Sequence, residues 1–115
     1  MMRRCRDEEG AALVETIFIM TFVLTLLLAG FEFGRGFRAY LMVTEAARDG
    51  ARTALDPTRT DANIQAAATS AASPLSVSVS VLRVAGTTTV TVTHSFDPLI
   101  GLLGPFVMQT RAVAK

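Results

Sequence analysis

The residues with the most distinctive chemistry are Gly10 and Glu15, which lie where a charged leader meets an apolar stretch. Residues 1–10 carry three Arg and three acidic residues, whereas residues 11–31 carry a single charge, Glu15. An ionisable side chain at membrane depth is costly when unpaired and usually functional. Cleavage after Gly10 would make Ala11 a new N-terminus, whose amine is mostly protonated at neutral pH. Pairing with Glu15 of a neighbouring subunit would then remove both desolvation penalties.

No other set of residues predicts catalysis or ligand binding. His94 is the only His and Cys5 the only Cys, so neither has partners for a metal site or an intrachain disulfide. His94 follows the phase of Val90 and Val92, which favours a half-buried histidine on a strand. We therefore expect no enzyme activity, no cofactor and no small-molecule substrate. With 11 basic and 10 acidic residues and a net charge of +1, the chain has no field to attract nucleic acid.

The apolar stretch predicts a single membrane-spanning helix over residues 11–33. Its first 21 residues span about 31 Å at 1.5 Å per residue, close to the thickness of a bilayer core. A buried core helix of a soluble protein is one alternative, but it would show a polar stripe. A cleaved secretory signal is another alternative, although the apolar region of such a signal is shorter than this one and contains no acidic residue. Arg residues flank the span on both sides, so charge alone does not decide its orientation.

Beyond the span, residues 34–55 predict an amphipathic continuation of the same helix, because no Pro occurs before Pro57. Pairs at i,i+3 spacing, such as Glu45–Arg48 and Asp49–Arg52, predict weak ion pairs on its polar faces. We expect one apolar face that serves intramolecular packing, subunit packing or both. Its members recur every three or four residues: Phe33, Phe37, Tyr40 or Leu41, Thr44, Ala47, Ala51 and Ala54.

Residues 56–115 predict a small outer region in which a second helix precedes a sheet. Thr60 or Asp61 is expected to cap a short helix that Ser73-Pro74 ends. Alternating Ser/Val and Thr/Val residues then predict two half-buried strands joined by a hairpin turn at 85–87, and a third strand follows from Phe106 to Val113. The apolar loop 99–103 is expected to plug the sheet or to contact a subunit or the membrane. The fold class is therefore α+β with a three-stranded antiparallel sheet.

Three segments of the chain carry a resemblance to a known family, which covers most of the chain from Gly10 onward. The last of them, residues 90–100 and 110–113, is similar to the closing strands of that family. Residues 9–15, with Gly10 followed by four apolar residues and Glu15, resemble the leader of type IV prepilins. Downstream residues resemble the signature of TadE-like pseudopilins of the tight-adherence (Flp) pilus system. The matching positions are Glu32, Phe33, Gly34, Arg35, Glu45, Ala46, Ala47, Arg48, Gly50, Ala51 and Arg52. Thr16 departs from the motif, which often has an aromatic residue there.

The resemblance implies a minor pseudopilin, with a pilin-like fold, that prepilin peptidase cleaves between Gly10 and Ala11. It implies a single-pass protein of the bacterial inner membrane, with residues 1–10 in the cytoplasm and residues 56–115 outside. Its implied partners are other pilins, prepilin peptidase, the inner-membrane assembly platform and the lipid bilayer. An uncleaved, signal-anchored binding domain with no filament role is the alternative function.

Overall fold

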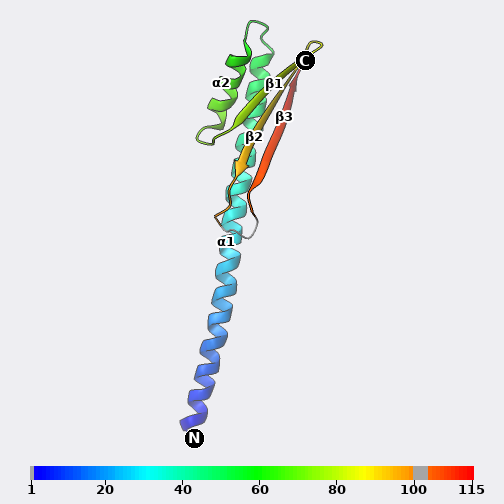
Figure 1. The fold of residues 1–115 in the computed structure, drawn as a ribbon. Helices are drawn as coiled ribbons and strands as arrows, with labels where there is room; N and C mark the ends of the chain where they lie inside the picture. Colours follow the sequence, from blue (N-terminus) through cyan, green and yellow to red (C-terminus); the bar gives the residue numbers. More distant parts are fainter. Residues whose placement is uncertain (1, 100–103) are drawn as a thin grey trace. The chain divides into compact units, whose positions relative to one another are not determined.

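The computed structural model describes residues 2–99 and 104–115, with side chains from Arg6 onward in these ranges. The chain forms α1, α2 and then three strands (Figure 1). The element bounds are α1 Met2–Ala54, α2 Asp61–Ala72, β1 Ser78–Val84, β2 Thr87–Phe96 and β3 Phe106–Ala114. These elements confirm the α+β class. They are distributed over two compact units, one ending at Gly34 and one from Arg35 to Lys115.

The first unit is the apolar part of α1. Its large apolar side chains between Leu13 and Phe31 are exposed, from 44% at Val23 to 73% at Phe18. The hydroxyls of Thr21 and Thr25 each donate to the carbonyl four residues earlier at 2.8 Å, so they are satisfied within the helix. One helix in the described chain is long and apolar enough to cross a membrane, and no part of its apolar stretch is buried. This stretch is therefore not a core helix of the chain.

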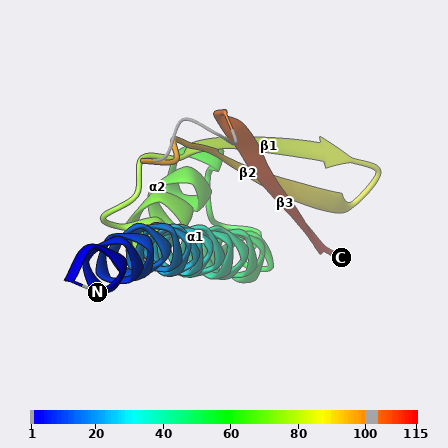
Figure 2. The ribbon, with the colours of Figure 1, turned by 90° about the horizontal axis from the view of Figure 1, so that it is seen from below.

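The second unit has its core between two helices and the sheet. The fully buried residues come from α1, α2 and the central strand: Val43, Ala46, Ala47, Ile64, Ala68, Ala72, Val90 and Val92. Figures 1 and 2 show α2 beside the second part of α1, with both helices on the same side of the sheet. The core is thus built mainly from Ala and Val, whose small side chains allow the backbones to approach closely.

The large side chains of the apolar face predicted for residues 34–55 are not buried within the described chain. Phe37, Tyr40 and Leu41 are 55%, 48% and 52% exposed. The buried face instead presents small residues, Gly36, Ala39, Val43, Ala46, Ala47, Gly50 and Ala51. Of the predicted face, Ala47 and Ala51 are buried within the chain, and Thr44 and Ala54 are half-buried. The physical reason is distance, because bulky side chains on this face would hold α2 and β2 away from the helix.

The connections follow the predicted signals closely. α1 ends at Ala54, shortly before Pro57, and α2 ends at Ala72, shortly before Pro74. Thr60 caps α2 with extended backbone angles (φ −83°, ψ 163°), and its hydroxyl accepts a hydrogen bond from the Asn63 amide. The predicted cap and the predicted end of the second helix are therefore confirmed.

The sheet has the order β1-β2-β3, and both pairs are antiparallel. Val90 of β2 lies opposite Val81 of β1 and Ala112 of β3. The β1–β2 turn contains Ala85 and Gly86, both with positive φ (48° and 80°), as a two-residue hairpin turn of type I′ requires. The predicted strands and hairpin are confirmed. Of the apolar loop 99–103, residues 100–103 lie outside the described residues, and Leu99 is 74% exposed.

Candidate functional site

The predicted cleavage site lies on exposed helix. Gly10, Ala11 and Glu15 are all exposed, and a Cβ atom at Gly10 would meet nothing within 4 Å. The helix begins at Met2, so Gly10 lies within a helical turn. Ala11 and Glu15 are four residues apart, which places them on one face of α1. Gly10 and Ala11 are thus uncovered by the rest of the described chain, and Glu15 lies on the same helix face as the residue that would follow the cut.

The downstream motif residues divide between the two faces of α1. Ala46 and Ala47 are fully buried, whereas Glu45, Arg48 and Arg52 are exposed. The predicted ion pairs Glu45–Arg48 and Asp49–Arg52 are present, each with a nitrogen–oxygen distance of 3.9 Å. Pairs this long and this exposed add little to stability. The alanines of the motif therefore build the core, and its charges keep the opposite face in water.

At Gly50, α1 lies close to both α2 and β2. A Cβ atom at this position would lie 2.8 Å from Cγ1 of Val90 on β2 and 3.3 Å from Cβ of Ala68 on α2. Carbon atoms pack favourably at about 3.5–4.0 Å, so neither neighbour leaves room for a methyl group. This glycine is required by packing, a role that its place in a sequence motif does not reveal.

The first four motif residues differ in their surroundings. Glu32 is buried (4% exposed) and Phe33 is 76% exposed. A Cβ atom at Gly34 would meet nothing within 4 Å. Arg35 is half-buried, and its guanidinium carbon lies 5.5 Å from the centre of the Phe96 ring, within cation–π distance. Phe96 is itself buried and packs against Phe106 with ring centres 5.1 Å apart.

Arg35 lines a cavity of about 370 Å³ that the sequence analysis did not predict. Its lining residues come from α1, the α2–β1 connection and the end of β2: Arg35, Arg38, Ala39, Met42, Pro74, Leu75, His94, Ser95, Phe96 and Asp97. His94 is half-buried, as predicted, and its Nδ1 lies 2.7 Å from the Ser76 carbonyl. Because a carbonyl only accepts, Nδ1 carries the proton. No sequence signal joins residues separated by some sixty positions, so only folding reveals this pocket.

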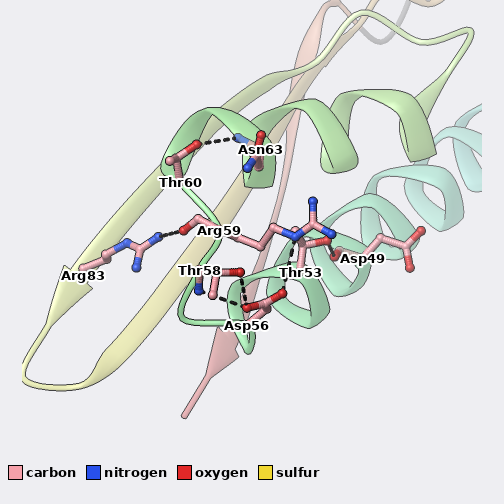
Figure 3. Close-up of polar contacts among 8 residues, drawn as sticks. All are labelled: Asp49, Thr53, Asp56, Thr58, Arg59, Thr60, Asn63 and Arg83. Carbon is pink, nitrogen blue, oxygen red and sulfur yellow. Dashed lines mark hydrogen bonds and ion pairs between the residues drawn. The ribbon is translucent and has the colours of Figure 1, made fainter.

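A second cluster of polar contacts, also missed, organises the connection between α1 and α2 (Figure 3). Asp56 accepts hydrogen bonds from the Thr58 hydroxyl (2.6 Å) and the Thr58 amide (2.9 Å). These bonds, the hydroxyl first and then the amide, with the nearby Arg59 guanidinium, hold the pKa of Asp56 below its ordinary value. The connection is therefore held by its own side chains.

Arg83 of β1 ties this connection to the sheet. Its Nε lies 2.7 Å from Asp61 Oδ1 at the start of α2, and its Nη2 donates to the Arg59 carbonyl at 3.0 Å. A guanidinium suits this arrangement because its planar fork donates in two directions at once. Among the described side chains, those of residues 6–99 and 104–115, no group of three or more His, Cys, Asp or Glu is arranged to hold a metal ion.

One comparison with known proteins matches part of the chain, the stretch of α1 that carries the predicted motif residues. No curated protein and no solved structure matches the chain. The family model described as "TadE-like protein" matches residues 10–52, from the predicted cleavage site to Arg52, the last of the motif positions given above. This family is not an enzyme family. A match to it suggests a pseudopilin associated with Tad pili, and it also suggests interaction with other pilus components. Together with one exposed apolar helix, the match supports a single-pass membrane protein. The resemblance to the TadE-like family is thereby confirmed over residues 10–52.

Proposed function

We propose that the protein is a minor pseudopilin of a tight-adherence pilus, cleaved by prepilin peptidase after Gly10 and used to assemble or prime the filament. Before assembly it would span the inner membrane once, with residues 1–10 in the cytoplasm and the sheet outside. The single observation that carries the proposal is that the exposed residues Gly10 and Ala11 lie where the charged part of α1 meets its apolar part, which no other part of the described chain covers.

The apolar face of the first unit supports a role in assembly. Side chains such as Phe18 (73% exposed) and Leu27 (66% exposed) are unfavourable in water, so they need lipid or other apolar helices around them. Phe37 and Tyr40, past the span, are also exposed. An assembly in which helices leave lipid and pack on one another would cover both sets.

Cleavage would create a positive charge that can pair with the Glu15 carboxylate when the helix leaves the lipid and packs against other subunits. The new Ala11 amine would be a cation within four residues of the carboxylate. Within one chain these groups share a helix face, and between stacked chains the amine of one subunit would meet Glu15 of the next. In either arrangement, pairing offsets the cost of burying two separate charges.

Intact-mass analysis of the membrane form tests the processing step. In cells with an active prepilin peptidase, we expect the mature chain to begin at Ala11. Gly10→Val should accumulate as the full-length chain. Gly34→Val is the matched control, because Cβ atoms at both glycines would meet nothing within 4 Å and the chemical change is the same. This control should be processed as in the wild type.

A mature chain that still begins at Met1 or Met2 would contradict cleavage. It would favour the alternative function, an uncleaved signal-anchored domain outside the cytoplasm. Equal processing of Gly10→Val and Gly34→Val would place the cut elsewhere in the chain.

A further inference from the structure

β1 and β3 form the two edges of the three-stranded sheet (Figure 1). Among the described residues, none outside the sheet forms a main-chain hydrogen bond with either edge strand. An edge strand of this kind presents a row of N–H and C=O groups that can pair with a further strand. Neither strand contains a Pro, and both pair with β2 residue by residue without a bulge, so two devices that commonly prevent such pairing are missing.

The sheet face turned away from the helices carries apolar residues at the same level of both edges. Leu82 of β1 and Val113 of β3 both lie opposite Thr89, so they belong to one row across the sheet. Thr89 precedes the fully buried Val90, and successive side chains of a strand point to opposite faces, so this row faces away from the core. Leu82 is 63% exposed and Val113 is 52% exposed. If β1 of a second copy lay beside β3 at this level, the two side chains would cover each other.

The charges of the two edges are compatible with this contact. Each strand contains one charged residue, Arg83 in β1 and Arg111 in β3. Arg83 lies on the side of the helices, where it contacts Asp61 of α2. Arg111 lies opposite Thr91, on the face away from the core. Like charges would therefore not face each other between the two copies, where they would be unfavourable.

The strand directions distinguish this contact from a contact between two β3 strands. β1 and β3 both run antiparallel to β2, so they run in the same direction. Placing β1 of one copy beside β3 of another in a parallel pair keeps both sheets in one orientation. Antiparallel pairing of β3 with β3 would reverse the second sheet. A contact between two different surfaces can repeat from copy to copy without closing, as successive subunits of a filament require.

We propose that the second unit associates head to tail with further copies of itself, through parallel pairing of β3 of one copy with β1 of the next. The sheet would then continue across copies, with Val113 of one copy against Leu82 of its neighbour. This inference rests on the proposed function, because it supplies a repeating contact between assembling subunits. It does not depend on where the chain is cleaved.

Disulfide cross-linking of the full-length protein in membranes tests the contact. Cys5, the single Cys of the chain, is replaced by Ser. Two copies with different tags are then co-expressed, one with Val113→Cys and one with Leu82→Cys. Neighbouring strands lie about 4.8 Å apart, a separation that a disulfide can span. On mild oxidation we expect the mixed pair to form a covalent dimer with about tenfold higher yield than Val113→Cys alone.

Val107→Cys, co-expressed with Leu82→Cys, is the matched control. Val107 is an exposed valine of the same strand (65%), but it lies about 20 Å along β3 from Val113. Its cross-linking to Leu82→Cys should stay at the background yield. All three substituted side chains are exposed, so the fold should remain intact, and circular dichroism of each variant checks this.

The outcomes separate the contact from its alternatives. Equal yields for the Val113→Cys and Val107→Cys pairs would mean random collision and would overturn the proposal. A dimer formed mainly by Val113→Cys with itself would indicate reversed β3–β3 pairing, and cross-links only to other proteins would exclude a second copy as the partner. Both results would also overturn it.

The same samples, analysed by intact mass, distinguish this inference from the cleavage proposal. Specific cross-linking of chains that begin at Met1 would support the contact and contradict cleavage. Chains that begin at Ala11 but do not cross-link would overturn the contact and leave cleavage supported.

Discussion

A Cβ atom at Gly50 would lie 2.8 Å from Cγ1 of Val90, so α1 passes β2 at a distance that only glycine allows. Gly50→Ala should therefore destabilise the second unit by about 1–3 kcal/mol, the usual cost of inserting a methyl group into a packed core. Thermal unfolding of the full chain in detergent should show a lower Tm. Gly36→Ala is the control, because its nearest contact would be an ordinary 3.7 Å to the Phe96 ring. If both variants unfold at the same temperature, the close contact between Gly50 and Val90 does not restrict the residue at position 50 to glycine.

Glu15→Ala should leave membrane insertion unchanged and reduce pilus assembly. Insertion needs only the apolar stretch, which the substitution makes more apolar. Assembly under our proposal needs the carboxylate opposite the Ala11 amine, so we expect about a tenfold loss of surface filaments, on the order of what losing a paired charge in an interface costs in affinity. Thr16→Ala is the neighbouring control, since the Thr16 hydroxyl already bonds to the Ala12 carbonyl of its own helix at 2.8 Å. Normal piliation in Glu15→Ala would rule out the pairing.

Asp61 and Arg83 should be energetically coupled, because their Oδ1 and Nε atoms lie 2.7 Å apart and join α2 to β1. Both side chains are partly exposed, so a double-mutant cycle with alanine should give a coupling of about 0.5–1 kcal/mol that falls as salt is added. The Glu45–Arg48 pair at 3.9 Å is the comparison, and its coupling should be close to zero. Similar values for the two pairs would show that the short contact has no special strength.

The hydrogen bonds of Asp56 predict a loss of stability in acid. Their effect is to lower the pKa of Asp56 in the folded chain, so the folded state binds its proton less tightly than the unfolded state. The contribution of these hydrogen bonds to stability is therefore fully present above the pKa of Asp56 in the unfolded chain, near pH 4. It is lost as the pH falls through the lower pKa of Asp56 in the folded chain. Unfolding measured against pH should show a smaller acid loss in Asp56→Asn than in the wild type.

An NMR titration of the Asp56 carboxyl provides the direct measurement. Thr58→Ala removes the hydroxyl that donates at 2.6 Å, so it should raise the pKa of Asp56 toward the ordinary value. A pKa at or above that value in the wild-type chain would refute the assigned hydrogen bonds.

The hairpin turn predicts a stabilising substitution. Ala85 adopts φ 48°, a left-handed conformation that costs an alanine about 1 kcal/mol, whereas asparagine tolerates it better. Ala85→Asn creates the preferred Asn-Gly pair of a type I′ turn and should raise stability by about 0.5–1 kcal/mol. Gly86→Ala, at φ 80°, should lower it. Equal Tm values for both variants would mean that the turn does not limit the stability of the sheet.

Much of the fold follows from local signals that the sequence carries. The apolar stretch, the Thr60 cap, the positions of Pro57 and Pro74 and the alternation around Val90 each act over a few residues, and the structure agrees with all of them. The large side chains of the apolar face predicted for residues 34–55 are not buried within the described chain, because periodicity shows which residues share a face, but not which of two faces a given partner will cover. Phe37 and Tyr40 have the greater hydrophobicity, yet the small face around Gly50 has the better fit.

The sequence by itself determined the apolar stretch, the Gly10 to Glu15 spacing and the order of helices and strands, since these depend on neighbours in the chain. Only the tertiary structure decided that Gly50 is a packing residue, that Arg83 holds the start of α2, and that Arg35 and Phe96 form the wall of a pocket. The physical reason is that each of these contacts joins elements far apart in sequence. Their partners are chosen by shape and distance, after the local elements have formed.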